Sequence, residues 1–99
     1  MSTPALNEAE ILERLESLDG WQRQGDTITK TFKTKTYLDG IALASAIGVI
    51  AEGFDHHPDM YIGWRKVTVT FTTHDAGNKL SHKDFDAAAA IDALPFPTE

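Results

Sequence analysis

The chain has 99 residues, no cysteine and a formal net charge of −6, from 9 Lys and Arg against 15 Asp and Glu. This length suits one domain with a modest core. The lack of cysteine excludes disulfides and thiol catalysis, and it fits a reducing compartment. A net negative chain with no run of basic residues is a poor candidate for direct nucleic-acid binding. We find no signal segment and no apolar run long enough to span a bilayer, so we expect a cytoplasmic protein without membrane contact.

The first third of the chain predicts a helix followed by a β-hairpin. Asn7 and Glu10 resemble a capping box that opens the helix. Apolar residues recur at helical spacing after it, at Ile11, Leu12, Leu15 and Leu18. A short strand begins at Trp21, which we expect in the core, and a turn at residues 25–26 leads to a second strand over residues 27–33.

The central helix is predicted to be apolar on two sides. Thr36 and Asp39 form its N-cap, and it runs to about Phe54. One apolar stripe comprises Leu43, Ile47, Ile50 and Phe54, and the other comprises Leu38, Ile41, Ala42 and Val49. One stripe can cover a sheet, and the other then needs a partner chain. The alternative is that the small residues of this helix tolerate exposure, and we favour the partner chain.

A second hairpin is predicted from two strands, over residues 60–64 and 67–73, with the turn at residues 65–66. Residues 67–73 alternate apolar side chains with threonine, as a half-buried strand does. With the turn centred there, counting outward along both strands sets His57 opposite His74. A shift of register would weaken this pairing.

Three of the 4 histidines lie at the open end of this hairpin, at His56, His57 and His74. Histidine exchanges protons near neutral pH, so the sequence indicates one proton-handling site. Pro58 favours an extended His57, and the adjacent imidazoles should then diverge. Three histidines can also hold a catalytic metal, but diverging rings suit acid–base work better, and we expect no metal. The fourth histidine, His82, is expected in solvent.

The last helix is predicted to begin at Ser81, with Asp84 three residues later. Its inner stripe comprises Ala87, Ala88, Ile91 and Leu94. Segments 1–6 and 95–99 are expected as frayed tails of a single domain over residues 1–99. The order α-β-β-α-β-β-α predicts an α+β fold, a four-stranded antiparallel sheet with three helices packed on one face.

The chain resembles the pterin-4a-carbinolamine dehydratase family. The residues that carry the resemblance are Glu52-Gly53-Phe54-Asp55-His56-His57-Pro58, Trp64, Val67, Thr73-His74-Asp75, Asp84 and Ile91-Asp92. The resemblance covers nearly the whole chain. It implies dehydration of 4a-hydroxytetrahydropterin to quinonoid dihydropterin, without metal or other cofactor, in a homodimer or homotetramer. An aromatic amino acid hydroxylase would be the functional partner that reuses the pterin.

Residue by residue, the resemblance implies three site histidines, His56, His57 and His74. It also implies a set of pterin-binding residues: Glu52, Asp55, Trp64, Thr72, Thr73, Asp75 and Asp84. We expect His57 and His74 to be the acid–base pair, with His56 orienting the pterin or sharing the acid role. Asp84 could equally be a capping carboxylate. Lys83 stands where the family commonly has arginine.

The second class of function is a protein-binding or assembly module, similar to a transcriptional cofactor, that keeps the fold without turnover. The complete set of three histidines favours catalysis, because a scaffold has no need of them.

Overall fold

The computed structural model describes residues 2–96 and 98 and has the predicted order of helices and strands. The elements are α1 (Glu8–Glu16), β1 (Gln22–Gln24), β2 (Thr27–Lys33), α2 (Tyr37–Phe54), β3 (Asp59–Gly63), β4 (Lys66–Phe71), the short 3₁₀ helix η1 (His74–Ala76) and α3 (His82–Asp92). The sheet has the order β1-β2-β4-β3, and all neighbouring strands are antiparallel. The α+β class is therefore confirmed.

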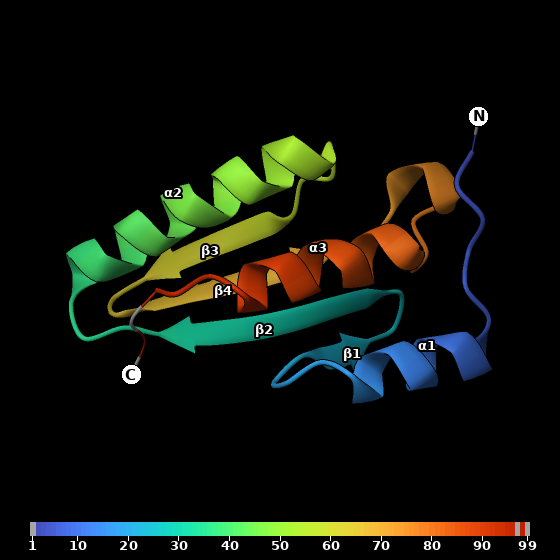
Figure 1. Ribbon diagram of the computed structural model, residues 1–99, viewed down its shortest axis with the longest axis horizontal. Helices are drawn as coiled ribbons and strands as arrows, with labels where there is room; N and C mark the ends of the chain where they lie inside the picture. Colours follow the sequence, from blue (N-terminus) through green and yellow to red (C-terminus); the bar gives the residue numbers. More distant parts are fainter. Residues whose placement is uncertain (1, 97, 99) are drawn as a thin grey trace.

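The helices cover one face of the sheet, with α2 above β3 and α3 beside it, while α1 lies next to β1 (Figure 1). Alternate strand residues point into the core between the layers, and Ile28, Val67, Val69 and Phe71 are all 0% exposed there. The opposite face of the sheet carries threonines, whose hydroxyls bond across β2 and β4 in the pairs Thr29–Thr70 and Thr31–Thr68. A sheet with one dry and one polar face is what the alternation in the sequence predicts.

The two apolar stripes of α2 have different surroundings. Leu43 and Ile47 of the first stripe are buried, whereas Leu38 and Val49 of the second are 74% and 75% exposed. By length and composition α2 could cross a membrane, with a mean hydropathy of 1.4 over 18 residues. This differs from the expectation that no apolar run is long enough to span a bilayer. However, the buried stripe packs into the protein core, as it does in a helix that covers a sheet.

The predicted register of the second hairpin is wrong. Gly63 pairs with Lys66, so the turn residues are Trp64 and Arg65, one position earlier than expected. Arg65 adopts a positive φ of 59°, which allows this two-residue turn. Extending the observed register would set Thr72, and not His74, opposite His57. In addition, β4 ends at Phe71 and the chain turns into η1.

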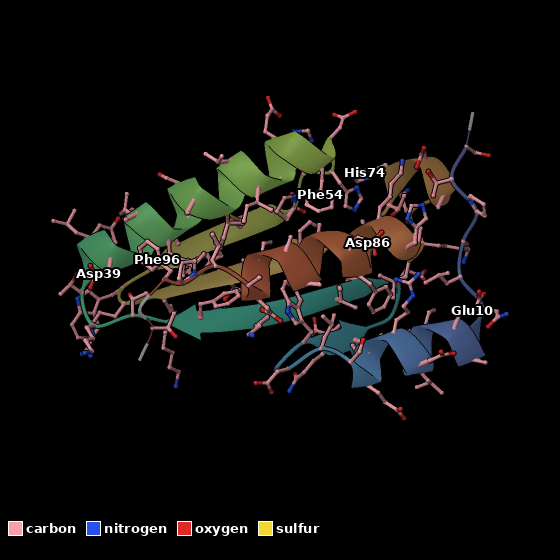
Figure 2. All side chains as sticks on the ribbon, viewed as in Figure 1. Glu10, Asp39, Phe54, His74, Asp86 and Phe96 are labelled. Carbon is pink, nitrogen blue, oxygen red and sulfur yellow. The ribbon has the colours of Figure 1, made fainter. Side chains whose placement is uncertain are left out.

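Both terminal segments that were expected to fray make contacts with the fold. The Thr3 hydroxyl donates to Oδ2 of Asp75 at 2.9 Å, and the Leu6 N–H donates to the Leu80 carbonyl at 2.9 Å. At the other end, Phe96 packs against the core (Figure 2). Positions 97 and 99 of the second tail lie outside the described residues.

Truncating the buried stripe of α2 tests this packing. We expect Ile47→Ala to lower the free energy of unfolding by about 2–5 kcal/mol, because it removes a fully buried side chain and leaves a cavity. Leu12→Ala, at an exposed position of α1, is the control and should change it by less than about 0.5 kcal/mol. Urea denaturation measures both, and equal effects would contradict the described core.

Candidate active site

The end of α2 places two adjacent histidines in different surroundings. Asp55 adopts a left-handed conformation, with φ 50° and ψ 41°. The His56 N–H then donates to the Ala51 carbonyl at 3.1 Å, which turns the chain toward β3. His56 is 8% exposed, whereas the His57 side chain is 58% exposed. The predicted divergence of the two imidazoles is confirmed.

His56 is held in a buried polar network. Its Nε2 lies 2.6 Å from Oδ1 of Asp84, and its ring stacks on Phe71 with 5.5 Å between centroids. Asp84 is 0% exposed, and its Oδ2 accepts from the Thr73 hydroxyl at 2.8 Å and the Ser81 N–H at 3.0 Å. Asp84 therefore caps α3 and also fixes the plane of the His56 ring. The Asp84 carboxylate is buried and does not line the pocket.

The other two histidines are exposed, and each has one hydrogen-bond partner. Nε2 of His57 lies 2.6 Å from Oε1 of Glu52. Nδ1 of His74 lies 2.7 Å from Oδ1 of Asn78. Figure 2 shows His74 near Phe54, the last residue of α2. Because an amide oxygen only accepts, Nδ1 of His74 is the donor, and a neutral ring carries its lone pair on Nε2. The Glu52 carboxylate likewise orients the His57 ring.

Asp75 follows His74 in the chain and contacts Thr3 near the N-terminus and Lys83 on α3. The hydrogen bond from the Thr3 hydroxyl lowers the pKa of the Asp75 carboxyl, and the Lys83 ammonium at 3.5 Å lowers it further, against the opposing effect of desolvation. Asp75 is therefore a fixed negative charge at this site at neutral pH.

These segments surround one pocket of about 480 Å³, within the roughly 300–1,000 Å³ usual for small-molecule sites. Its lining residues are Asp55, His56, His57, Pro58, Asp59, Thr73, His74, Asp75 and Lys83. Three aspartates and one lysine, Lys83, are among these lining residues. Phenylalanine, tyrosine and tryptophan are absent from the described residues that line it.

Six of the ten predicted site residues line this pocket. Glu52 and Asp84 do not line it but bond His57 and His56, and the remaining two lie elsewhere. Trp64 is at the turn between β3 and β4, at the opposite end of the hairpin, and is 74% exposed. The Thr72 hydroxyl donates to the Asp26 carbonyl at 2.8 Å and does not line the pocket. Sequence reasoning missed Asp59 and did not place Lys83 in the site. The position of Lys83 between Ser81 and Asp84 was the available signal, because that segment begins α3.

The arrangement can donate and accept protons at two exposed imidazoles beside a third that is fixed. Within residues 2–96 and 98, no three His, Cys, Asp or Glu side chains are grouped so that they could hold a metal ion.

Comparisons with known proteins agree on one family. The model of the pterin 4 alpha carbinolamine dehydratase family matches residues 4–94. A homologue from Roseiflexus castenholzii carrying that family's name is 52% identical over 89 residues, which cover 90% of this chain and 95% of the homologue. Another, from Natronomonas pharaonis, is 47% identical over 89 residues, covering 90% and 94%.

Two solved structures are similar as well. The transcriptional coactivator/pterin dehydratase from Brucella melitensis superposes with a TM-score of 0.83 at 33% identity, covering 90% of this chain and 96% of that one. A pterin dehydratase-like protein, identified as a RuBisCO assembly factor in the α-carboxysome, has a TM-score of 0.59 at 26% identity, covering 74% and 83%. From its sequence and its fold, this chain belongs to the pterin-4a-carbinolamine dehydratase family.

Proposed function

We propose that this protein dehydrates a 4a-hydroxytetrahydropterin to the quinonoid dihydropterin, as a step of pterin cofactor recycling. The observation that carries the proposal is the pocket that gathers His56, His57 and His74 in a chain of this family. The aromatic amino acid hydroxylases, which form the carbinolamine and reuse the reduced pterin, would be its functional partners. We expect this work in the cytoplasm, consistent with the absence of cysteine.

The reaction requires two proton transfers and no redox step. The C4a–O bond breaks while an acid protonates the departing hydroxyl, which leaves as water. A base removes the proton from a ring nitrogen, and the electron pair of that N–H bond forms the new C=N bond. The acid ends deprotonated and the base protonated, so exchange with solvent restores both.

The exposure of His57 and His74 suits this exchange with solvent. We assign them as the acid–base pair, and the lone pair on Nε2 of His74 suits the base. His56, fixed by Asp84 and Phe71, orients the pterin or shares the acid role. Glu52 orients His57. Asp55, Thr73 and Asp75 flank the bound pterin.

Removing either exposed imidazole tests the assignment. We expect His57→Ala and His74→Ala each to lower the dehydration rate by about 10²–10⁴-fold, the usual contribution of a general acid or base. His82→Ala is the matched control, because His82 is exposed and bonds Asp86 on α3. The rate is followed by the ultraviolet absorbance of the carbinolamine, and wild-type rates in both site variants would refute the assignment.

Asp84→Asn tests the positioning of His56. The amide would bring donors toward the Thr73 hydroxyl and Ser81 N–H, which are themselves donors. We expect a loss of roughly 1–3 kcal/mol in the free energy of unfolding and a lower kcat. Asp86→Asn, on the exposed side of α3, should change neither greatly. An unaltered His56 ring resonance and kcat in Asp84→Asn would show that the contact does not matter.

A second candidate function is a binding or assembly module, and the similarity to the RuBisCO assembly factor is the observation that favours it. Such a protein would use its exposed apolar faces and would have no need of the histidines. A folded wild-type protein that does not dehydrate the carbinolamine, yet binds a defined protein partner, would support this function over catalysis.

We also propose that the chain forms a homodimer or homotetramer, because α2 and β3 expose large apolar residues. These are Leu38, Val49 and Phe54 on α2, and Met60, Tyr61 and Ile62 on β3. Large apolar residues exposed on neighbouring elements often mark an interface.

Sedimentation equilibrium should therefore give a multiple of the 10.9 kDa chain mass. Val49→Glu should lower the assembly state if α2 contributes an interface, while Leu12→Glu on α1 should not. A monomeric wild-type protein at micromolar concentration would contradict the proposal.

A further inference from the structure

The turn between β3 and β4 contacts the loop between β2 and α2, at the opposite end of the hairpin from the histidine pocket (Figure 1). The Thr34 N–H donates to the Arg65 carbonyl at 3.0 Å, and Nε of Arg65 donates to the Thr34 carbonyl at 3.3 Å. Thr34 is 0% exposed. Because these bonds join a buried residue to the turn, the two segments keep a fixed position relative to each other.

Positive charge gathers where these segments meet. The chain has 9 Lys and Arg, and five of them form ion pairs with carboxylates elsewhere in the described fold. The other four, Lys33, Lys35, Arg65 and Lys66, belong to the turn and the loop. Within residues 2–96 and 98, no carboxylate lies within 4.0 Å of the ammonium groups of the three lysines. Their charge is therefore not neutralised by the part of the chain that the structure describes.

Two of these lysines face each other directly. Lys33 of β2 and Lys66 of β4 are partners in the strand register. Like charges directly opposite each other destabilise a sheet. The neighbouring pair on the same face, Thr31 and Thr68, joins its hydroxyls at 2.9 Å instead. A bound anion between the two ammonium groups would offset their repulsion.

A pocket of about 190 Å³ lies at this cluster, and its lining residues are Lys33, Trp64, Arg65 and Lys66, which we call the basic turn site. Three of them are cations and none is a carboxylate, whereas the histidine pocket has three aspartates. Trp64 is 74% exposed, and the Arg65 guanidinium lies over its ring, 5.1 Å from the centroid. One face of the indole is thus held by the cation, and the exposure leaves the other face for a ligand.

We propose that the basic turn site binds a phosphate group carried on a planar ring, as in a nucleoside monophosphate. Guanidinium and ammonium groups are the usual partners of phosphate. The pocket is smaller than the roughly 300–1,000 Å³ that encloses a whole small molecule, so it holds the phosphate while the ring stacks outside on Trp64. An acidic peptide would engage the lysines but would leave the indole without a planar partner. The site is separate from the histidine pocket, and its ligand does not depend on the proposed dehydration.

Adenosine 5′-monophosphate tests the site by titration calorimetry, with adenosine and inorganic phosphate as its two halves. We expect the nucleotide to bind at least about tenfold more tightly than either half, because the stacked ring and the phosphate each add a contact. Added salt should weaken its binding. No saturable binding of the nucleotide, or an equal affinity for inorganic phosphate, would overturn the proposal.

Variants of the basic turn site separate binding from stability. Lys66→Gln should weaken nucleotide binding by about tenfold, yet its melting temperature should stay the same or rise, because Lys33 loses a repulsive neighbour. Trp64→Ala should lower the affinity for the nucleotide to that for phosphate, and Trp64→Phe should restore it. Lys79→Gln is the matched control, since Lys79 is exposed and pairs with Asp26, and it should bind the nucleotide as the wild type does.

The location of binding needs its own control, because the histidine pocket also takes a planar ring under the proposed function. A folded protein with both His57→Ala and His74→Ala should bind the nucleotide as tightly as the wild type. Loss of binding in that protein, with binding intact in Lys66→Gln and Trp64→Ala, would assign the nucleotide to the histidine pocket and overturn the proposal. Since no readout is a dehydration rate, a failure of the proposed function would leave this test unaffected.

Discussion

The hydrogen bond between His56 and the buried Asp84 is the contact on which the site depends. It joins the end of α2 to the start of α3, two segments 28 residues apart in the chain. The same carboxylate caps α3 and accepts from Thr73, so the segment leading to His74 is tied to this point as well. Because the network is buried, leaving any of its donors unpaired would cost free energy of folding. This network therefore fixes the segments that carry the two exposed histidines, His57 and His74.

The division between one buried and two exposed histidines gives the site its chemical character. A ring stacked on Phe71 and bonded to Asp84 can position a ligand, but it exchanges protons with solvent less readily than an exposed ring. His57 and His74 reach solvent and each has a single oxygen partner. A dehydration that consumes one proton and releases another needs such groups, and needs no electron donor or acceptor.

The N-terminal ends of the helices could be predicted from the sequence, but the register of the second hairpin could not. The capping boxes at Asn7 and Ser81 and the N-cap at Thr36 are all present, because each uses a local side-chain contact that the residue types encode. The turn depends instead on Arg65 in a conformation that glycine or asparagine would signal and arginine does not. A turn one residue earlier moved every pair of the hairpin.

The histidine site, too, could be predicted from the sequence only in part. Alternation along an extended chain predicted that His56 and His57 would diverge, but not which of them would be buried, since that depends on the left-handed turn at Asp55. The local motif predicted most of the residues that line the pocket, but it also included Trp64, which the observed turn places at the opposite end of the hairpin.

The most direct test of the account is the dehydration of a freshly generated 4a-hydroxytetrahydropterin by the wild-type protein and by a folded variant with both His57→Ala and His74→Ala. We expect the wild-type protein to speed the loss of the carbinolamine well above the uncatalysed rate, and we expect the double variant not to do so. Equal rates for the two proteins would contradict it.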